Sequence, residues 1–230
     1  MYADLGAPVG DNVMVVRIDG GCFLSTEPVA AIAAVCERAE DGDGTAAVVV
    51  HVSGAPDGVW ARDLTVQLVN KWEQALRRLE RLPAATIAVA TGDCGGMALD
   101  ALLATDHRIA AESARLVLPV QGGLIWPGMA LYRLARQVPN AAAVRQAVLF
   151  GGALGMREAL AMNLVHEVTD DLSGSLAAAV ERVSTVSGSE LAVRRQLTLD
   201  AQAVGFEDAL GVHLAACDRA LRRVAAGTAS

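Results

Sequence analysis

The stretch Ile87–Asp106, IAVATGDCGGMALDALLATD, decides how this 230-residue chain folds. It begins with the apolar run Ile87–Val89, which predicts a strand buried on both faces. Three glycines follow within a few positions and end at Gly96, where the backbone can turn tightly and come close to a ligand. From Met97 the apolar spacing becomes helical. The free amides of a helix N-terminus are therefore predicted at the glycine turn.

The junction between turn and helix is suited to chemistry at an oxygen atom. Free amides and the positive end of a helix dipole stabilise an oxygen that gains negative charge during a reaction. Asp100 follows one turn later, near enough to move a proton there. The dipole alone also favours an aspartate in the first turn, by about 0.3–1 kcal/mol, so a structural role for Asp100 stays open. Asp106 is expected to be structural, bonding where the helix meets the next strand.

Strand and helix patterns alternate around this stretch. Val13–Ile18 and Val48–Val52 are predicted strands, and Thr26–Asp41 is a predicted helix. A long amphipathic helix is expected from Asp63 and stops before Pro83. This alternation predicts an α/β fold with crossovers around a mostly parallel sheet.

The C-terminal third is predicted to be helical, apart from a strand at Leu164–Val168. We expect a core over residues 1–170 and a helical region over residues 171–230 that does not fold independently. That region carries more helically spaced apolar side chains than a thin layer of helices can bury alone: Leu191, Leu197, Phe206, Leu210, Leu214 and Leu221.

Composition excludes several classes of function. A net charge of −7 argues against nucleic acid as a partner. The chain is 53% hydrophobic, yet no apolar run approaches the roughly 20 residues of a membrane span. With no secretory signal pattern, a cytoplasmic protein is predicted. The four cysteines lack metal-ligand spacing, so we expect no metal site and small buried thiols.

The run LERLPAATIAVATGDCGGMALDALLATDHRIA, residues 79–110, resembles the core of the crotonase (enoyl-CoA hydratase/isomerase) superfamily. The likeness continues through ARLVLPVQGGLIWPGMALYRLARQV and LFGGALGMREALAMNLVHEV, and spans about residues 46 to 168. It implies a crotonase-like spiral of ββα units, followed by a C-terminal helical region through which subunits associate as a homotrimer or hexamer.

The resemblance also implies a ligand, a coenzyme A thioester, so that coenzyme A enters as part of the substrate and no separate cofactor is expected. Two backbone amides would hold the thioester carbonyl oxygen. One would come from Met97 after Gly96, and the other from Trp60 or Ala61. Trp126 is expected either to form a wall of the substrate cleft or to pack in the core.

The carboxylates depart from the pattern of the superfamily. Its hydratases use two glutamates, and an ungapped alignment places these positions at Asp100 and Val120. Because a valine can neither orient water nor transfer a proton, hydration by two carboxylates is not expected. If the placement of Val120 is wrong, Glu112 is the alternative second acid. Asp100 alone can still move a proton alpha to a thioester or assist an elimination.

A second enzyme class of the same spiral fold, the Clp-type serine peptidases, is excluded. Its nucleophilic serine would fall on Gly95 or Gly96, and glycine has no hydroxyl to begin covalent catalysis.

A narrower resemblance is carried by KWEQALRRLERLPA, GDCGGMALDALLATD and WPGMALYRLA. These segments look like the hydratase-like proteins of 3,5-dihydroxyphenylglycine biosynthesis. Such proteins act with a type III polyketide synthase and a second crotonase-like enzyme to form 3,5-dihydroxyphenylacetyl-CoA. Three functions stay open: a lyase acting on a polyketide-CoA, a hydratase or isomerase of other acyl-CoA metabolism, and a non-catalytic partner that stimulates the synthase.

Overall fold

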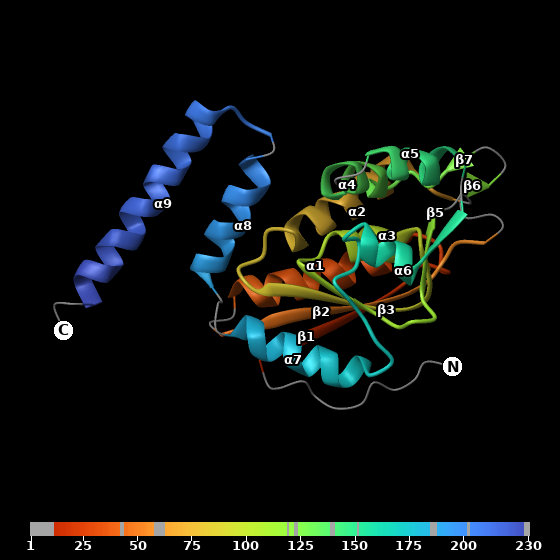
Figure 1. Ribbon diagram of the computed structural model, residues 1–230, viewed down its shortest axis with the longest axis horizontal. Coiled ribbons are helices and arrows are strands. Elements are labelled where there is room, and N and C mark those ends of the chain that lie inside the picture. Colours follow the sequence, from red (N-terminus) through yellow and green to blue (C-terminus); the bar gives the residue numbers. More distant parts are fainter. Residues whose placement is uncertain are drawn as a thin grey trace.

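The computed structural model describes residues 12–41, 44–57, 63–118, 120–121, 124–138, 141–150, 152–184, 188–201 and 203–227. Within these ranges the chain forms a sheet with helices on both faces, and a helical arm lies beyond one end of the sheet (Figure 1). No helix among these residues is long and apolar enough to cross a membrane.

The described residues form a sheet of seven strands. Five run parallel, in the spatial order β1 (Val13–Asp19), β2 (Ala47–Gly54), β3 (Ala85–Gly95), β4 (His107–Ala110) and β9 (Glu167–Val168). The end of β3 also pairs in parallel with β5 (Arg115–Leu118), and β5 pairs antiparallel with β8 (Gly152–Gly155). A separate antiparallel ribbon joins β6 (Val120–Gln121) and β7 (Leu124–Ile125).

Each face of the sheet has its own core, because successive side chains of a strand point to opposite faces. Val48 and Val50 of β2 pack in the larger cluster, which is shared with α1 (Thr26–Asp41), α2 (Val66–Leu79) and α3 (Met97–Leu103). Val49 of β2 packs on the opposite face, in a smaller cluster with Leu176 of α7 (Leu172–Ser184). Figure 1 shows α1 and α2 on one side of these strands and α7 on the other.

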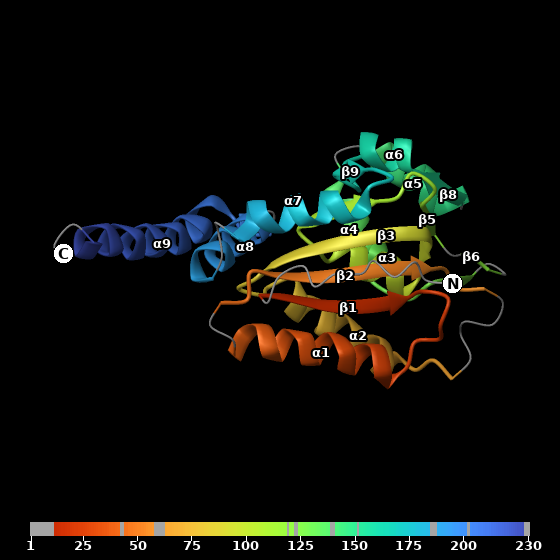
Figure 2. The same cartoon turned by 90° about the horizontal axis from the view of Figure 1, so that it is seen from below.

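Two helices lie along the branch of the sheet formed by β5 and β8, namely α5 (Ala141–Phe150) and α6 (Met156–Ala161), and α4 (Ala130–Gln137) packs against α3 and α5. The arm consists of α8 (Ser189–Ala201) and α9 (Phe206–Gly227), and the main contacts of α9 are with α8. Figure 2 shows α9 farthest from the sheet.

Arg195 attaches α8 to the body of the protein. Its Nε donates to Asp106 Oδ1 at 2.8 Å, and its Nη2 donates to Asp106 Oδ2 and to the carbonyl of Ala84. Asp106 Oδ2 also accepts bonds from the backbone amide and hydroxyl of Thr86, at 2.8 and 2.9 Å. Asp106 therefore bonds at the junction between helix and strand, as the sequence predicts, and in addition holds the arm.

The mixed α/β fold with a parallel sheet is confirmed, and the differences are local. The helix expected from Asp63 begins at Val66, because the Thr65 hydroxyl accepts the amide of Leu68 and caps it. The strands β5 and β8 were not predicted, and each is four residues long.

Two further expectations were wrong in part. Of the strand expected at Leu164–Val168, only its last two residues pair, because the amide of Leu164 bonds to Ala159 at the end of α6. The thiols of Cys36 and Cys94 are buried as expected, but Cys22 is exposed because it lies in the turn after β1. Cys217 is half-buried on α9.

Candidate functional site

Gly96 alone joins β3 to the N-terminus of α3, because Gly92 and Gly95, expected in the turn, lie in the last part of β3. Gly96 has φ 51° and ψ −126°, a backbone conformation that residues other than glycine rarely adopt. A Cβ at Gly96 would lie 2.6 Å from Pro56 Cγ and 3.5 Å from the Trp126 ring, so glycine lets these two side chains pack against the turn. Met97 is the first residue of α3 and is 1% exposed. Its amide belongs to the first turn of the helix, where amides have no intrahelical partner.

Asp100 is completely buried one turn into α3. Two indoles donate to the same carboxylate oxygen: Trp126 Nε1 lies 2.7 Å and Trp72 Nε1 3.2 Å from Asp100 Oδ2. The other oxygen, Oδ1, is buried and has no hydrogen-bond partner among the described residues. One oxygen is thus held in place while the other is available for a proton.

The pKa of Asp100 is raised to about 7, first by burial and then by the negative charge of Glu73. The two indole hydrogen bonds and the charge of Arg133 act in the opposite direction and limit the rise. A buried carboxyl stays neutral to a higher pH because the ionised form loses its hydration. Asp100 therefore changes protonation state near neutral pH, where a general acid or base is most effective.

A buried ion-pair network lies beside Asp100, between α2 and α4. Arg133 Nη1 lies 2.8 Å from Glu73 Oε2, and Arg133 Nε lies 2.7 Å from Glu80 Oε1. The second oxygen of Glu73 accepts the backbone amide of Met129 at 2.7 Å. Because each charge has a partner, the network avoids the cost of an isolated buried ion.

The segment Trp126–Met129 connects the ion-pair network to Asp100, because its Met129 amide binds Glu73 and its Trp126 indole binds Asp100. A Cβ at Gly128 would lie 2.1 Å from Asp100 Oδ2 and 2.6 Å from Trp126 Nε1. Glycine is therefore required for the backbone to pass this close to the carboxyl group. Trp126 itself is 4% exposed. Its indole packs in the core, which is one of the two roles expected for it, and it also binds Asp100.

The structure brings together Gly96, Met97, Asp100 and Trp126 among the site residues that the sequence predicts. Trp60 and Ala61, the candidates for the second amide, lie outside the described residues. Val120 begins the short strand β6, and its side chain is likewise outside the description. The alternative acid Glu112 is exposed between β4 and β5.

Sequence reasoning missed Trp72, Glu73 and Arg133. Trp72 fits the apolar stripe of the amphipathic helix α2, so its spacing indicates a core residue and gives no sign of a contact with Asp100. Glu73 beside it is 8% exposed, and a charged residue next to a buried tryptophan was the available signal. Arg133 pairs with Glu73 across 60 positions of sequence, which local patterns cannot detect.

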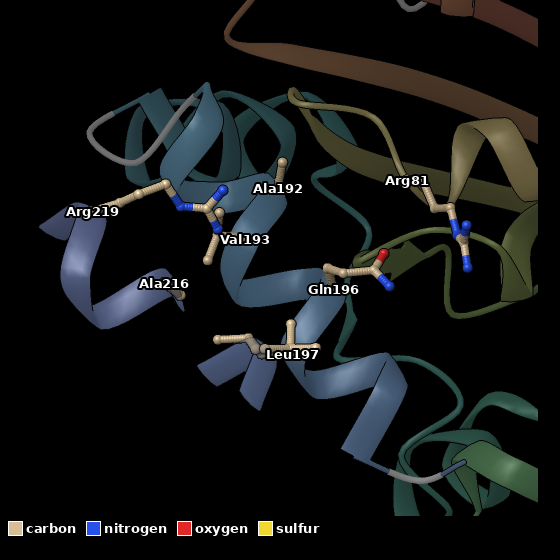
Figure 3. Close-up of a pocket in the computed structure, with 8 residues that line it drawn as sticks. Arg81, Ala192, Val193, Gln196, Leu197, Ala216 and Arg219 are labelled. Atoms are coloured by element: carbon tan, nitrogen blue, oxygen red, sulfur yellow. The ribbon is translucent and has the colours of Figure 1, made fainter. Parts of the chain in front are cut away.

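A separate pocket of roughly 270 Å³ lies between α8, α9 and the chain after α2. Figure 3 shows Ala192, Val193, Gln196 and Leu197 on one side, Ala216 and Arg219 on α9, and Arg81 across from them. It is lined by apolar side chains with an arginine at either side, and none of the residues around Asp100 takes part in it.

The chain is similar to known proteins in both sequence and structure. The sequence model of the family described as enoyl-CoA hydratase/isomerase matches residues 62–211. A protein of Amycolatopsis orientalis named enoyl-CoA-hydratase is 50% identical over 212 residues, covering 92% of this chain and 97% of that protein.

Solved structures show the same fold at lower identity. An enoyl-CoA hydratase/isomerase from Cupriavidus metallidurans CH34 superposes with a TM-score of 0.80 at 20% identity, covering 91% of this chain and 85% of the other. An enoyl-CoA hydratase from Polaromonas sp. JS666 superposes with a TM-score of 0.79 at 18% identity, covering 94% and 91%. At such identities the likeness shows the fold alone.

Proposed function

The chain belongs to the enoyl-CoA hydratase/isomerase family, and from that premise we propose that it removes water from a polyketide-CoA thioester. The product pathway we propose leads to 3,5-dihydroxyphenylacetyl-CoA, the precursor of dihydroxyphenylglycine. In that pathway the protein works with a type III polyketide synthase and a second crotonase-like enzyme. Coenzyme A takes part as a portion of the substrate.

The observation that carries this proposal is the buried Asp100 carboxyl, with a pKa of about 7, beside the N-terminus of α3. In the proposed step, Asp100 takes the proton alpha to the thioester carbonyl. The amide of Met97 and one from Trp60 or Ala61 stabilise the enolate oxygen. The β-hydroxyl then leaves with the proton held by Asp100, so one water is released and one carbon–carbon double bond forms.

A single carboxyl group is sufficient for such an elimination, because the proton that it removes is the proton that the leaving group needs. Hydration in the usual manner of the family calls for a second carboxylate, and Val120 occupies the aligned position. Because elimination is the reverse of hydration, the substrate makes the difference: an activated polyketide has a more acidic alpha hydrogen, which one carboxylate can remove. Elimination from an activated polyketide is therefore favoured over hydration of a simple enoyl-CoA.

The test is to combine the purified protein with malonyl-CoA and the type III polyketide synthase, and to follow products by mass spectrometry. Asp100→Asn should keep the fold, because an amide oxygen still accepts the indole N–H groups, but should lower turnover by about 10²–10⁴. For the natural protein, kcat/KM should rise with pH through about 7, since the base must be ionised to take the proton.

Asp93→Asn is the matched control for this experiment. Asp93 lies near the end of β3, before Gly96, and forms a partly exposed ion pair with Arg115, and such pairs contribute little. Its turnover should equal that of the natural protein. Unchanged product formation by Asp100→Asn would reject the proposed catalytic role.

Two alternatives also have support, the first from the same burial of Asp100 and the second from the comparison with a relative. Asp100 is completely buried, which favours a non-catalytic partner that stimulates the synthase. The name of the Amycolatopsis orientalis relative favours an enoyl-CoA hydratase of other acyl-CoA metabolism. The same reconstitution separates them. If the protein only stimulates the synthase, the Asp100→Asn variant should stimulate it as well as the natural protein does. If the protein is a general hydratase, it should convert crotonyl-CoA in the absence of the synthase.

We also propose that the protein assembles as a homotrimer or hexamer. On the arm, Phe206, Leu214 and Leu221 are 75%, 56% and 69% exposed. Large apolar side chains gathered on a helix that contacts little of its own chain support burial against another subunit.

A further inference from the structure

We propose that Glu73 and Arg133 form a positioning pair that fixes the Trp126–Met129 segment against Asp100. The inference rests on the proposed function of Asp100, and it adds two residues that do not themselves touch the substrate.

Glu73 holds the far end of the segment. Its two oxygens bind different parts of the same turn: Oε1 accepts the Met129 amide at 2.7 Å, and Oε2 accepts Arg133 Nη1 at 2.8 Å. Met129 is the residue before α4, and Arg133 lies one turn into that helix. One carboxylate thereby sets both the position and the direction of the start of α4.

Arg133 is in turn prevented from moving. Its Nε donates to Glu80 at 2.7 Å, and the other oxygen of Glu80 accepts Arg77 Nη1 at 2.9 Å. Arg133 is 6% exposed, so its planar guanidinium is held by α2 on two sides. The positioning pair is therefore held by one helix, α2, through Glu73 and, two turns later, the C-cap residue Glu80.

The near end of the segment has no room to shift. The Trp126 indole reaches Asp100 Oδ2 at 2.7 Å, and Gly128 passes too close to this oxygen for a Cβ to fit. The residue before Glu73 is Trp72, which supplies the second indole bond to Asp100. One turn of α2 consequently determines both indole contacts, one directly through Trp72 and one through Glu73 and the segment.

The charges of the pair act on Asp100 in opposite directions. Glu73 on α2 raises the pKa of Asp100, and Arg133 on α4 lowers it. The indoles of Trp72 and Trp126 also face the carboxyl group and lower the pKa as donors. Removing the charge of Glu73 while keeping its shape should thus favour the ionised form of Asp100.

The experiment is a pH titration of the tryptophan indole N–H signals by ¹H–¹⁵N NMR, with assignments from Trp→Phe variants of the full chain. In the natural protein the indoles of Trp72 and Trp126 should shift together, with one midpoint set by Asp100. In Glu73→Gln this midpoint should fall by about one pH unit. Glu80→Gln, which removes the same charge from the far side of Arg133, is the matched control and should move the midpoint much less.

An unchanged midpoint in Glu73→Gln, or an equal fall in Glu80→Gln, would overturn the inference. Should Glu73→Gln fail to fold, hydrogen exchange of the Met129 amide in the natural protein decides the matter. A clamped amide exchanges far more slowly than a free one, whereas exchange at the free rate would overturn the proposal. Neither readout needs turnover, so a failure of the proposed dehydration leaves both results interpretable.

Discussion

At the scale of single residues, the close approach of Gly128 to Asp100 shows how little space surrounds the candidate site. The carboxyl group is enclosed by α3, two indoles and a backbone segment, and a single glycine allows the last of these to approach. Such enclosure raises the pKa of Asp100, and it makes the site sensitive to a change of one methyl group.

Gly128→Ala tests this enclosure. The added methyl group would meet Asp100 Oδ2 at 2.1 Å, so the segment must move and the bond from Trp126 should break. We expect a lower melting temperature, a changed Trp126 fluorescence and loss of most activity. Gly211→Ala is the control: its Cβ meets nothing within 4 Å on α9, and alanine should stabilise that helix by about 0.5–1 kcal/mol. A Gly128→Ala protein as stable and active as the natural one would contradict the described packing.

His166 gives a second prediction at this scale, for acid stability. Its Nδ1 accepts the amide of Arg108 at 3.0 Å, and its ring stacks on His107 with centroids 5.2 Å apart. Burial first, then the charges of Arg108 and His107, lower the pKa of His166 to about 4. The neutral ring is thus favoured by folding, and its contribution is present above the ordinary pKa of 6.5 and lost as pH falls towards 4.

The free energy of unfolding should therefore decrease between pH 6.5 and 4, in part because of His166. His166→Asn, whose amide oxygen can take the place of Nδ1 as an acceptor, should reduce that decrease. Urea unfolding of both proteins at pH 7 and pH 5 measures the difference. If the two proteins lose equal stability between these values, His166 is not responsible.

At the scale of elements, the attachment of α8 depends on a contact between segments far apart in sequence. Arg195 and Asp106 are separated by 89 positions, and the side chain of Arg195 is 8% exposed. Arginine suits this role because its fork of donors binds both carboxylate oxygens and a backbone carbonyl at once.

Arg195→Gln should release the arm while leaving the sheet intact. Asp106 loses one partner of its half-buried carboxylate, which is costly, but its bonds from Thr86 of β3 still hold the junction between α3 and β4 to the sheet. Hydrogen exchange over α8 should become faster, with β3 unchanged. Arg194→Gln serves as the control, because its exposed pair with Glu190 contributes little. Equal protection of α8 in both variants would show that the arm is held by other contacts.

At the scale of the whole molecule, the arm exposes apolar surface that the rest of its own chain does not cover. A pair of helices such as α8 and α9 draws most of its stability from packing of its apolar face, so it has little stability in water while that face is exposed. Closed symmetric assembly would bury it. The proposed trimer or hexamer thus connects the exposure of Phe206, Leu214 and Leu221 with the stability of the arm.

We expect a homotrimer or hexamer in sedimentation at micromolar concentration, and Leu214→Arg with Leu221→Arg should shift it towards the monomer. The two substitutions lie on the exposed side of α9, so the sheet and the site around Asp100 should be unaffected. Arg219→Gln, at the pocket between α8 and α9, removes a charge without adding one to the apolar face and should keep the assembly. A natural protein that sediments as a stable monomer would refute this expectation.

The sequence by itself predicted most of the helices and strands of the core, and the junction at which Asp100 lies. Apolar runs such as Ile87–Val89 and the helical spacing after Met97 depend on neighbours within one or two turns, so local pattern is sufficient to predict them. For the same reason the glycine turn and Asp100 could be assigned to one junction. The resemblance of residues 46–168 to a known superfamily then indicated the fold and a thioester ligand.

Only the tertiary structure decided what surrounds Asp100. Its two indole partners lie 28 positions before it and 26 after it, and Glu73 meets Arg133 across 60 positions. Each of these residues fits its own helix or turn equally well without the others. They meet because β3 and the helices pack at one particular register, and that register is set by the burial of the whole core rather than by any local pattern.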